Sequence, residues 1–171
     1  MARKKWLRIH QRKRWHELQG RRSRARGLDA ERIAVEATKE LLRSRFFDAY
    51  AHARHNDELD ASHIDIAMAN LQEHKLFVLQ IKTKVKKSPL HVGHETPAER
   101  HRRKYPHIPL IEVRVDKHWK TQVRTVKRSI MRLCRAAPSA ERVLDAKTLG
   151  IIAEQFRQRG YRGPYFWEDN K

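Results

Sequence analysis

The fold of this chain is decided by residues 62–82, which read SHIDIAMANLQEHKLFVLQIK. Two apolar runs, residues 62–69 and 76–82, flank a polar and turn-prone segment at residues 70–75. Apolar runs of strand length that are separated by a short polar segment predict two antiparallel strands joined as a hairpin. The sequence therefore predicts that this hairpin forms the centre of a β-sheet.

Polar side chains interrupt both strands of the predicted hairpin. Because side chains alternate between the two faces of a strand, Gln80 and Lys82 share one face, and a suitable register brings Asp65 to meet them. A buried strand that carries a lysine needs a reason, since burying an unpaired charge is costly. We therefore interpret Asp65, Gln80 and Lys82 as a chemical site; the alternative is that Lys82 only begins the basic loop that follows.

A helix is predicted before the hairpin. Asp29 is a good N-cap residue, and residues 30–43 repeat apolar side chains on one helical face. Glu31 falls on the edge of that apolar face, whereas Glu36 and Glu40 fall on the polar side. Helical phase therefore selects Glu31 as a carboxylate that can approach the predicted site.

The rest of the chain predicts a mixed α/β domain. Further elements are expected as a strand at 46–51, a polar loop at 54–58, a long connection at 88–107 with a short helix after Thr96 and Pro97, a strand at 108–115, a helix at 120–135 and a last helix capped by Asp145. This order predicts one mixed sheet of about four strands flanked by helices. We divide the chain into a basic N-terminal arm at 1–26, a core at 27–137, and a C-terminal helix with an aromatic tail at 138–171. The tail is expected to pack on the core; stacking on bases is the alternative.

The charge of the chain indicates a polyanionic partner. There are 39 Lys and Arg residues against 20 Asp and Glu, a formal net charge of +19. Such an excess suits nucleic acid, and we expect DNA rather than RNA. The expected nucleic-acid contacts come from the arm and from the loop after the hairpin: Arg12, Lys13, Arg14, Arg21, Arg22, Lys84, Lys86 and Lys87.

Composition also excludes several classes of protein. No apolar run approaches the roughly 18 residues of a membrane-spanning helix, and the N-terminus has no apolar signal-peptide segment. The single Cys134 excludes an internal disulfide framework. A cytoplasmic location is expected, in association with the nucleoid if the source is bacterial.

The residue types of the predicted site suit phosphodiester hydrolysis. This reaction needs an activated water and neutralisation of charge on phosphate oxygens, and a hard cation such as Mg²⁺ or Mn²⁺ prefers oxygen ligands. Asp65 would anchor the metal, with the Gln80 amide oxygen and the Ile81 carbonyl beside it. Lys82 would hold the attacking water or stabilise the transition state. Glu31 would contribute a second carboxylate through a metal-bound water. Zinc bound by His91, His94, His101 and His107 is the weaker alternative, because these residues lack cysteine partners.

The arrangement resembles the PD-(D/E)xK nuclease superfamily, which has the restriction-endonuclease-like fold. The glycine and glutamate of Gly27-x-x-x-Glu31 resemble its helical motif, residues 64–66 its Asp strand, and residues 79–83 (LQIKT) the Q-x-K variant of its catalytic strand. The resemblance covers about residues 27–135. It implies a Mg²⁺-dependent endodeoxyribonuclease in repair, recombination, restriction or a mobile element, with Glu31, Asp65, Gln80 and Lys82 as catalytic residues. Gln80 departs from the acidic residue that the motif usually has at this position, which removes one formal charge from the metal site.

Two other functions remain open at this stage. A non-catalytic nucleic-acid-binding accessory or ribosome-associated protein with a degenerate nuclease site would explain both the charge and Gln80. A component of a larger protein machine would use the arm and the tail to reach its partners. Cleavage of both strands by this fold usually needs two sites, so a homodimer is also expected.

Overall fold

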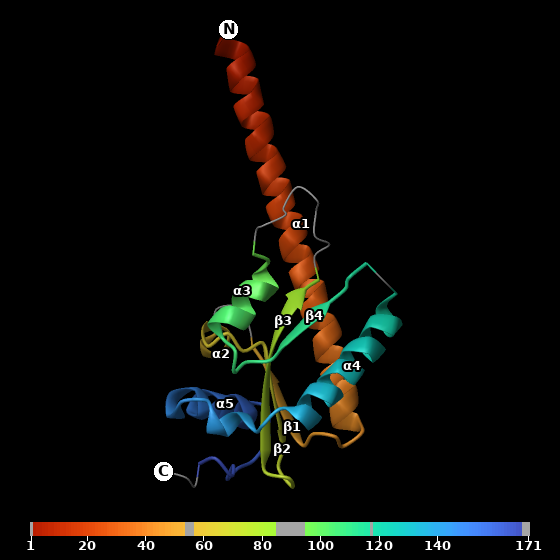
Figure 1. The fold of residues 1–171 in the computed structure, drawn as a ribbon, viewed down its shortest axis with the longest axis vertical. Coiled ribbons are helices and arrows are strands. Elements are labelled where there is room, and N and C mark those ends of the chain that lie inside the picture. The colour runs from red at the N-terminus through yellow and green to blue at the C-terminus, as the bar shows by residue number, and fades with distance from the viewer. Residues whose placement is uncertain (1, 54–56, 85–94, 117, 169–171) are drawn as a thin grey trace.

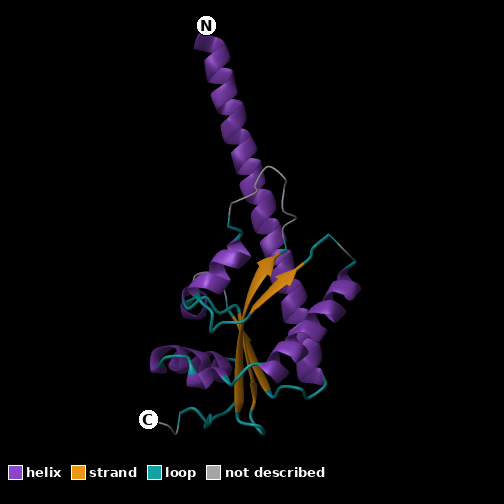
Figure 2. Cartoon of the chain, in the orientation of Figure 1, coloured by secondary structure: helices purple, strands orange, loops and turns teal. Residues whose placement is uncertain are grey.

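The computed structural model of the protein describes residues 2–53, 57–84, 95–116 and 118–168, with side chains from residue 17 onward. The chain forms one four-stranded sheet with helices against both of its faces (Figures 1 and 2). In chain order the elements are α1 (Ala2–Arg43), β1 (Ala49–His52), α2 (Glu58–Ala61), β2 (Ile66–Asn70), β3 (Lys75–Thr83), α3 (Pro97–Lys104), β4 (Leu110–Val113), α4 (Trp119–Ala136), the 3₁₀ turn η2 (Ala140–Arg142) and α5 (Ala146–Gln158).

The sheet is mixed, as the sequence predicts. Its strand order is β1-β2-β3-β4; the first two pairings are antiparallel and β3 pairs with β4 in parallel. The predicted hairpin is confirmed, with Ile66 opposite Leu79 and Asn70 opposite Lys75. The first strand of the hairpin begins at Ile66 rather than Ser62, because α2 and the turn after it occupy the preceding residues.

Each face of the sheet builds its own apolar core. On one face Leu79 and Ile81 pack with α1 and α4 around Leu41 and Ile130. On the other face the buried side chains of the same strand, such as Val78, pack against α5 and the C-terminal tail. The alternation read from β3 is therefore confirmed, and it leaves Gln80 and Lys82 on the face opposite α1 and α4.

One prediction at the N-terminus is wrong. Asp29 does not cap a helix, because α1 begins at Ala2 and runs without a break to Arg43. The basic residues before position 27 are good helix formers without proline, and Gly27 lies in open space, so nothing stops propagation. At about 1.5 Å per residue α1 is roughly 63 Å long, and its first half projects beyond the sheet (Figure 1).

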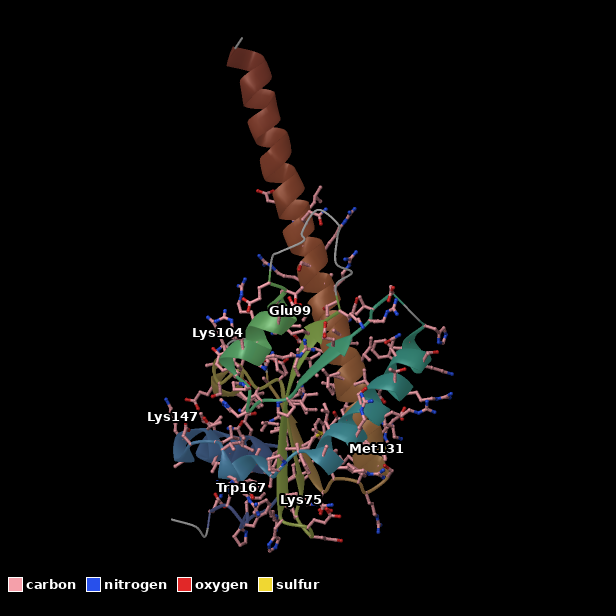
Figure 3. The ribbon with its side chains drawn as sticks, viewed as in Figure 1. Lys75, Glu99, Lys104, Met131, Lys147 and Trp167 are labelled. Carbon is pink, nitrogen blue, oxygen red and sulfur yellow. The ribbon has the colours of Figure 1, made fainter. Side chains whose placement is uncertain are left out.

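The aromatic tail packs on the domain. Asp145 caps α5 as predicted and accepts a hydrogen bond from the Thr148 amide at 2.7 Å. After α5 the chain turns at Gly160, whose φ of +85° is a left-handed conformation that glycine adopts without strain. Tyr165 and Trp167 are then buried against Phe156, with Trp167 labelled in Figure 3. Stacking of these two rings on bases is therefore excluded in this conformation. No helix within the described ranges has the length and apolarity to cross a membrane.

Candidate functional site

Strands β2 and β3 separate at Asp65, and the carboxylate of Asp65 occupies the fork between them. The ladder ends where Ile66 pairs with Leu79, and the Asp65 amide makes a last bond to the Leu79 carbonyl at 2.9 Å. The next amide of β3 that points toward β2 belongs to Ile81, and it donates to Asp65 Oδ2 at 2.5 Å. The side chain of Asp65 therefore replaces a backbone partner, which fixes the carboxylate in position.

Gln80 makes the second contact with this carboxylate. Its Nε2 donates a hydrogen bond to Asp65 Oδ2 at 2.6 Å, which is the contact expected from the hairpin register. Gln80 is only 4% exposed, and its Oε1 is buried without a hydrogen-bond partner in the described part of the chain. Because half a turn of the amide exchanges its oxygen and nitrogen, Gln80 can present Oε1 to a cation beside Asp65 instead.

The electrostatic environment of Asp65 identifies its neighbours. Burial, the largest cause, raises the pKa of Asp65 to about 6, from an ordinary value near 3.8. The Ile81 amide and the positive charge of Lys82 act in the opposite direction and lower it, whereas the carboxylates of Glu31 and Asp60 raise it further. Three carboxyl groups and one ammonium group therefore lie close enough to influence one another.

A cleft of about 110 Å³ opens between α1 and the fork. Glu31, Asp60, Asp65 and Ile81 are among its lining residues, and Val35, one turn after Glu31, lines it too. Glu31 is exposed, and the helix phase predicted from the sequence places it on the correct side of α1. Because the side chains of β3 alternate, Gln80 and Lys82 belong to the sheet face opposite α1. Asp65 therefore faces the cleft beside α1 and also contacts Gln80 from the other face of the sheet.

The side of the site opposite α1 is built by α3 and the turns next to it. Tyr105 Oη lies 2.6 Å from His63 Nε2, and the two rings pack with centroids 4.2 Å apart. His101 is buried, and its Nε2 lies 3.1 Å from the Ile108 carbonyl. Burial lowers the pKa of His101, and the positive charge of Lys82 lowers it further. The charge of Lys82 therefore acts on both Asp65 and His101.

His63 has an unusual backbone conformation. Its φ is +60°, a left-handed backbone conformation that residues other than glycine adopt at an energetic cost. This turn directs the chain from α2 toward Asp65 and the start of β2 at Ile66. The hydrogen bond between His63 Nε2 and Tyr105 Oη ties this turn to the end of α3.

Sequence reasoning missed Asp60, His101 and Tyr105 as members of this site. The segment at 54–58 was expected to be a polar loop, but α2 begins at Glu58 with Asp57 as its N-cap, and Asp57 Oδ1 accepts from the Asp60 amide at 2.8 Å. A signal for the other two was present in the sequence. The predicted helix after Thr96 and Pro97 forms with a complete capping box, and the four-residue spacing places His101 and Tyr105 on one side of it.

Some of the residues expected to contact nucleic acid lie within the described part of the chain, and others do not. Arg21 and Arg22 are exposed on α1, and Lys84 is exposed directly after β3. Arg12, Lys13 and Arg14 belong to the same helix, but their side chains lie outside the description. Lys86, Lys87, His91 and His94 also lie outside the described residues.

The site offers oxygen ligands rather than a ready-made cluster. Within the described ranges no group of three or more His, Cys, Asp or Glu side chains is placed to hold a metal ion. A cation beside Asp65 would therefore need the Gln80 amide oxygen or the Ile81 carbonyl in addition to Glu31. Such all-oxygen surroundings suit Mg²⁺ or Mn²⁺ better than zinc.

Comparison with known proteins leaves the chemistry of the site to be inferred from its own geometry. No family model matches the chain, and no curated protein or solved structure matches it.

Proposed function

We propose that the protein is a divalent-metal-dependent endonuclease with a restriction-endonuclease-like core, which hydrolyses phosphodiester bonds in DNA. The observation that carries this proposal is the position of Asp65. Its carboxylate is held at the fork by the Ile81 amide, contacts Gln80 at 2.6 Å and interacts with Lys82 and Glu31. The helix with Glu31, the Asp65 that directly precedes β2 and the strand with Q-x-K thereby meet around one carboxylate.

The residues at the fork fit a hard divalent cation. Asp65, Glu31, the buried Oε1 of Gln80 and the Ile81 carbonyl would hold Mg²⁺ or Mn²⁺, and the bound ion would lower the pKa of a water molecule and neutralise phosphate charge. The raised pKa of Asp65 supports this assignment, because a buried carboxylate accepting two hydrogen bonds still lacks enough positive charge nearby.

The side chains of the protein have separate tasks in this proposal. Lys82 donates a hydrogen bond to the attacking water or to a non-bridging phosphate oxygen, and it stabilises negative charge that develops there. Before the metal binds, Gln80 holds the Asp65 carboxylate in one orientation through its Nε2. The exposed Arg21, Arg22 and Lys84 neutralise phosphates on either side of the cleaved bond.

The experiment that tests the proposal is cleavage of supercoiled plasmid DNA by the full-length protein. We expect nicked and linear products with Mg²⁺ or Mn²⁺ and none with EDTA. Intact plasmid under every divalent metal, with binding retained, would instead support the second candidate. That candidate is a non-catalytic nucleic-acid-binding accessory protein, and the observation that favours it is the Gln80 amide, which already satisfies Asp65 without a cation.

A further inference from the structure

Helix α4 carries a one-sided charge that the proposed cleavage site does not use. Its 18 residues include no Asp or Glu, and its basic residues are Lys120, Arg124, Lys127, Arg128, Arg132 and Arg135. At about 100° per residue these six fall within an arc of roughly 140°. The apolar residues of α4, Val123, Val126 and Ile130, are buried on the opposite arc.

This pattern is unfavourable for the helix itself. Lys120, Arg124, Arg128 and Arg132 follow one another at four-residue intervals, so each repels the next along the helix surface. No acidic residue occupies the first turn, where the helix dipole would favour one. Within the described ranges α4 makes one salt bridge, in which Lys127 Nζ lies 3.2 Å from Glu40 Oε2. A surface that destabilises its own helix indicates a partner that compensates the repulsion.

The basic face of α4 lies apart from the cleft at Asp65. A groove of about 690 Å³ runs between α4 and α1, lined on the α1 side by Glu36 and Glu40. On a helix these two residues lie roughly 140–180° away from Glu31, which faces the cleft. Helix α1 therefore separates the two surfaces, and Figure 1 shows α4 and α3 on either side of it.

We propose that the exposed face of α4 is a second nucleic-acid site, which binds the phosphate backbone of a duplex segment away from the cleavage site. From Lys120 to Arg135 the row is about 22 Å long, a length that covers roughly six phosphates of one DNA strand. Trp119, 44% exposed, directly precedes the row and lines the adjoining groove together with Lys120.

The residues between the basic side chains favour nucleic acid over an acidic protein. Thr121 and Thr125 separate the charges on the exposed arc, and both are small and polar. Protein interfaces depend on buried apolar or aromatic anchors; the apolar side chain in the middle of this row is Met131, which packs partly against the core of the protein itself. A regular row of six cations around one partly buried apolar side chain matches a regular row of phosphates better than it matches a protein interface.

The test compares two triple variants of the full-length protein with equal loss of charge. The α4 variant is Arg124→Gln, Arg128→Gln, Arg132→Gln. The control is Arg142→Gln, Lys147→Gln, Arg162→Gln, whose three residues are exposed and belong to the C-terminal part of the chain, with Lys147 on α5 in Figure 3. Binding to a labelled 30-base-pair duplex is measured by fluorescence anisotropy in EDTA over a series of salt concentrations. Because no metal is present, the result does not depend on cleavage at Asp65.

The α4 variant is expected to bind at least about tenfold more weakly near 0.15 M salt. The slope of log K against log salt should become shallower by about 2 to 3, because each phosphate contact contributes roughly 0.9. The control should change affinity less than about twofold. The melting temperature of the α4 variant should stay equal or rise, since repulsion within the helix is removed.

Three results would overturn the proposal. Equal loss of affinity in both triple variants would show that only total charge matters. An unchanged salt slope in the α4 variant would show that α4 contacts no phosphates. Competition by polyglutamate as strong as competition by unlabelled duplex would assign the surface to an acidic protein instead.

Discussion

Replacing Lys82 with alanine is expected to lower the rate of DNA cleavage at least about a hundredfold, with binding to the same DNA changed less than about threefold. The charge of Lys82 acts on both Asp65 and His101, and in the proposed mechanism its ammonium group stabilises the charge that develops on the phosphate. Loss of one well-placed donor to a developing charge reduces rates by about 10² to 10³. Cleavage and binding are measured separately, by plasmid nicking with Mn²⁺ and by anisotropy in EDTA.

The control for Lys82 is a lysine at the other end of the same strand. Lys75 begins β3, is exposed and pairs only with Glu73 among the described residues (Figure 3). Lys75→Ala removes the same charge and should cut at close to the wild-type rate. Equal rates for Lys82→Ala and the wild-type protein would exclude Lys82 from the reaction.

Replacing Asp65 with asparagine is expected to stabilise the metal-free protein while abolishing cleavage. The pKa of Asp65 is raised in the folded state, so folding favours the protonated form. The protonated form of Asp65 contributes its full stabilisation of the fold below pH 3.8, the ordinary pKa. This contribution is lost as pH rises through about 6. At neutral pH the charged carboxylate therefore destabilises the fold by an amount on the order of 3 kcal/mol, since each pKa unit corresponds to about 1.4 kcal/mol.

Asparagine removes this charge and keeps the hydrogen bonds. The Ile81 amide and Gln80 Nε2 both donate to Asp65 Oδ2, so the single amide oxygen of asparagine at that position can accept both hydrogen bonds. Urea denaturation in EDTA between pH 4 and 8 should show a stability that falls with pH in the wild-type protein and a flatter profile in Asp65→Asn.

A second aspartate provides the matched control. Hydrogen bonds from Thr148 lower the pKa of Asp145 at the start of α5, so its charge stabilises the fold and Asp145→Asn should give no gain. A lower stability of Asp65→Asn than of the wild-type protein at pH 7 in EDTA would contradict the account of Asp65.

The hairpin was predictable because two apolar runs of strand length flank a short polar segment, and the second run ends in an alternation of apolar and polar residues. Leu79 and Ile81 are apolar while Gln80 and Lys82 are polar, and only one register puts the apolar side chains into the core. The contact between Asp65 and Gln80 follows from that register. Helical phase likewise brought Glu31 to the cleft, because Ile33, Ala34 and their neighbours had to face the sheet.

The remaining parts of the site depend on features that a local pattern does not contain. The N-terminus of α1 was misplaced because Asp29 has the residue type of a cap, although nothing in the preceding residues stops the helix. Asp60 lies in a helix of one turn, which has too few residues for a periodic signal. Tyr105 reaches the site through a bond to His63, 42 residues away in sequence, and such a contact depends on the tertiary structure.

The most direct test of the central claim is a calorimetric titration of the full-length protein with Mn²⁺, repeated with Asp65→Asn. The claim is that Asp65, Gln80 and Glu31 present oxygen ligands for one divalent cation at the fork between β2 and β3. We predict saturable binding to the wild-type protein, accompanied by release of protons near pH 6 because the cation displaces the proton of Asp65, and loss of this binding in Asp65→Asn. Equal binding by both proteins, or none by either, would contradict a metal site at Asp65.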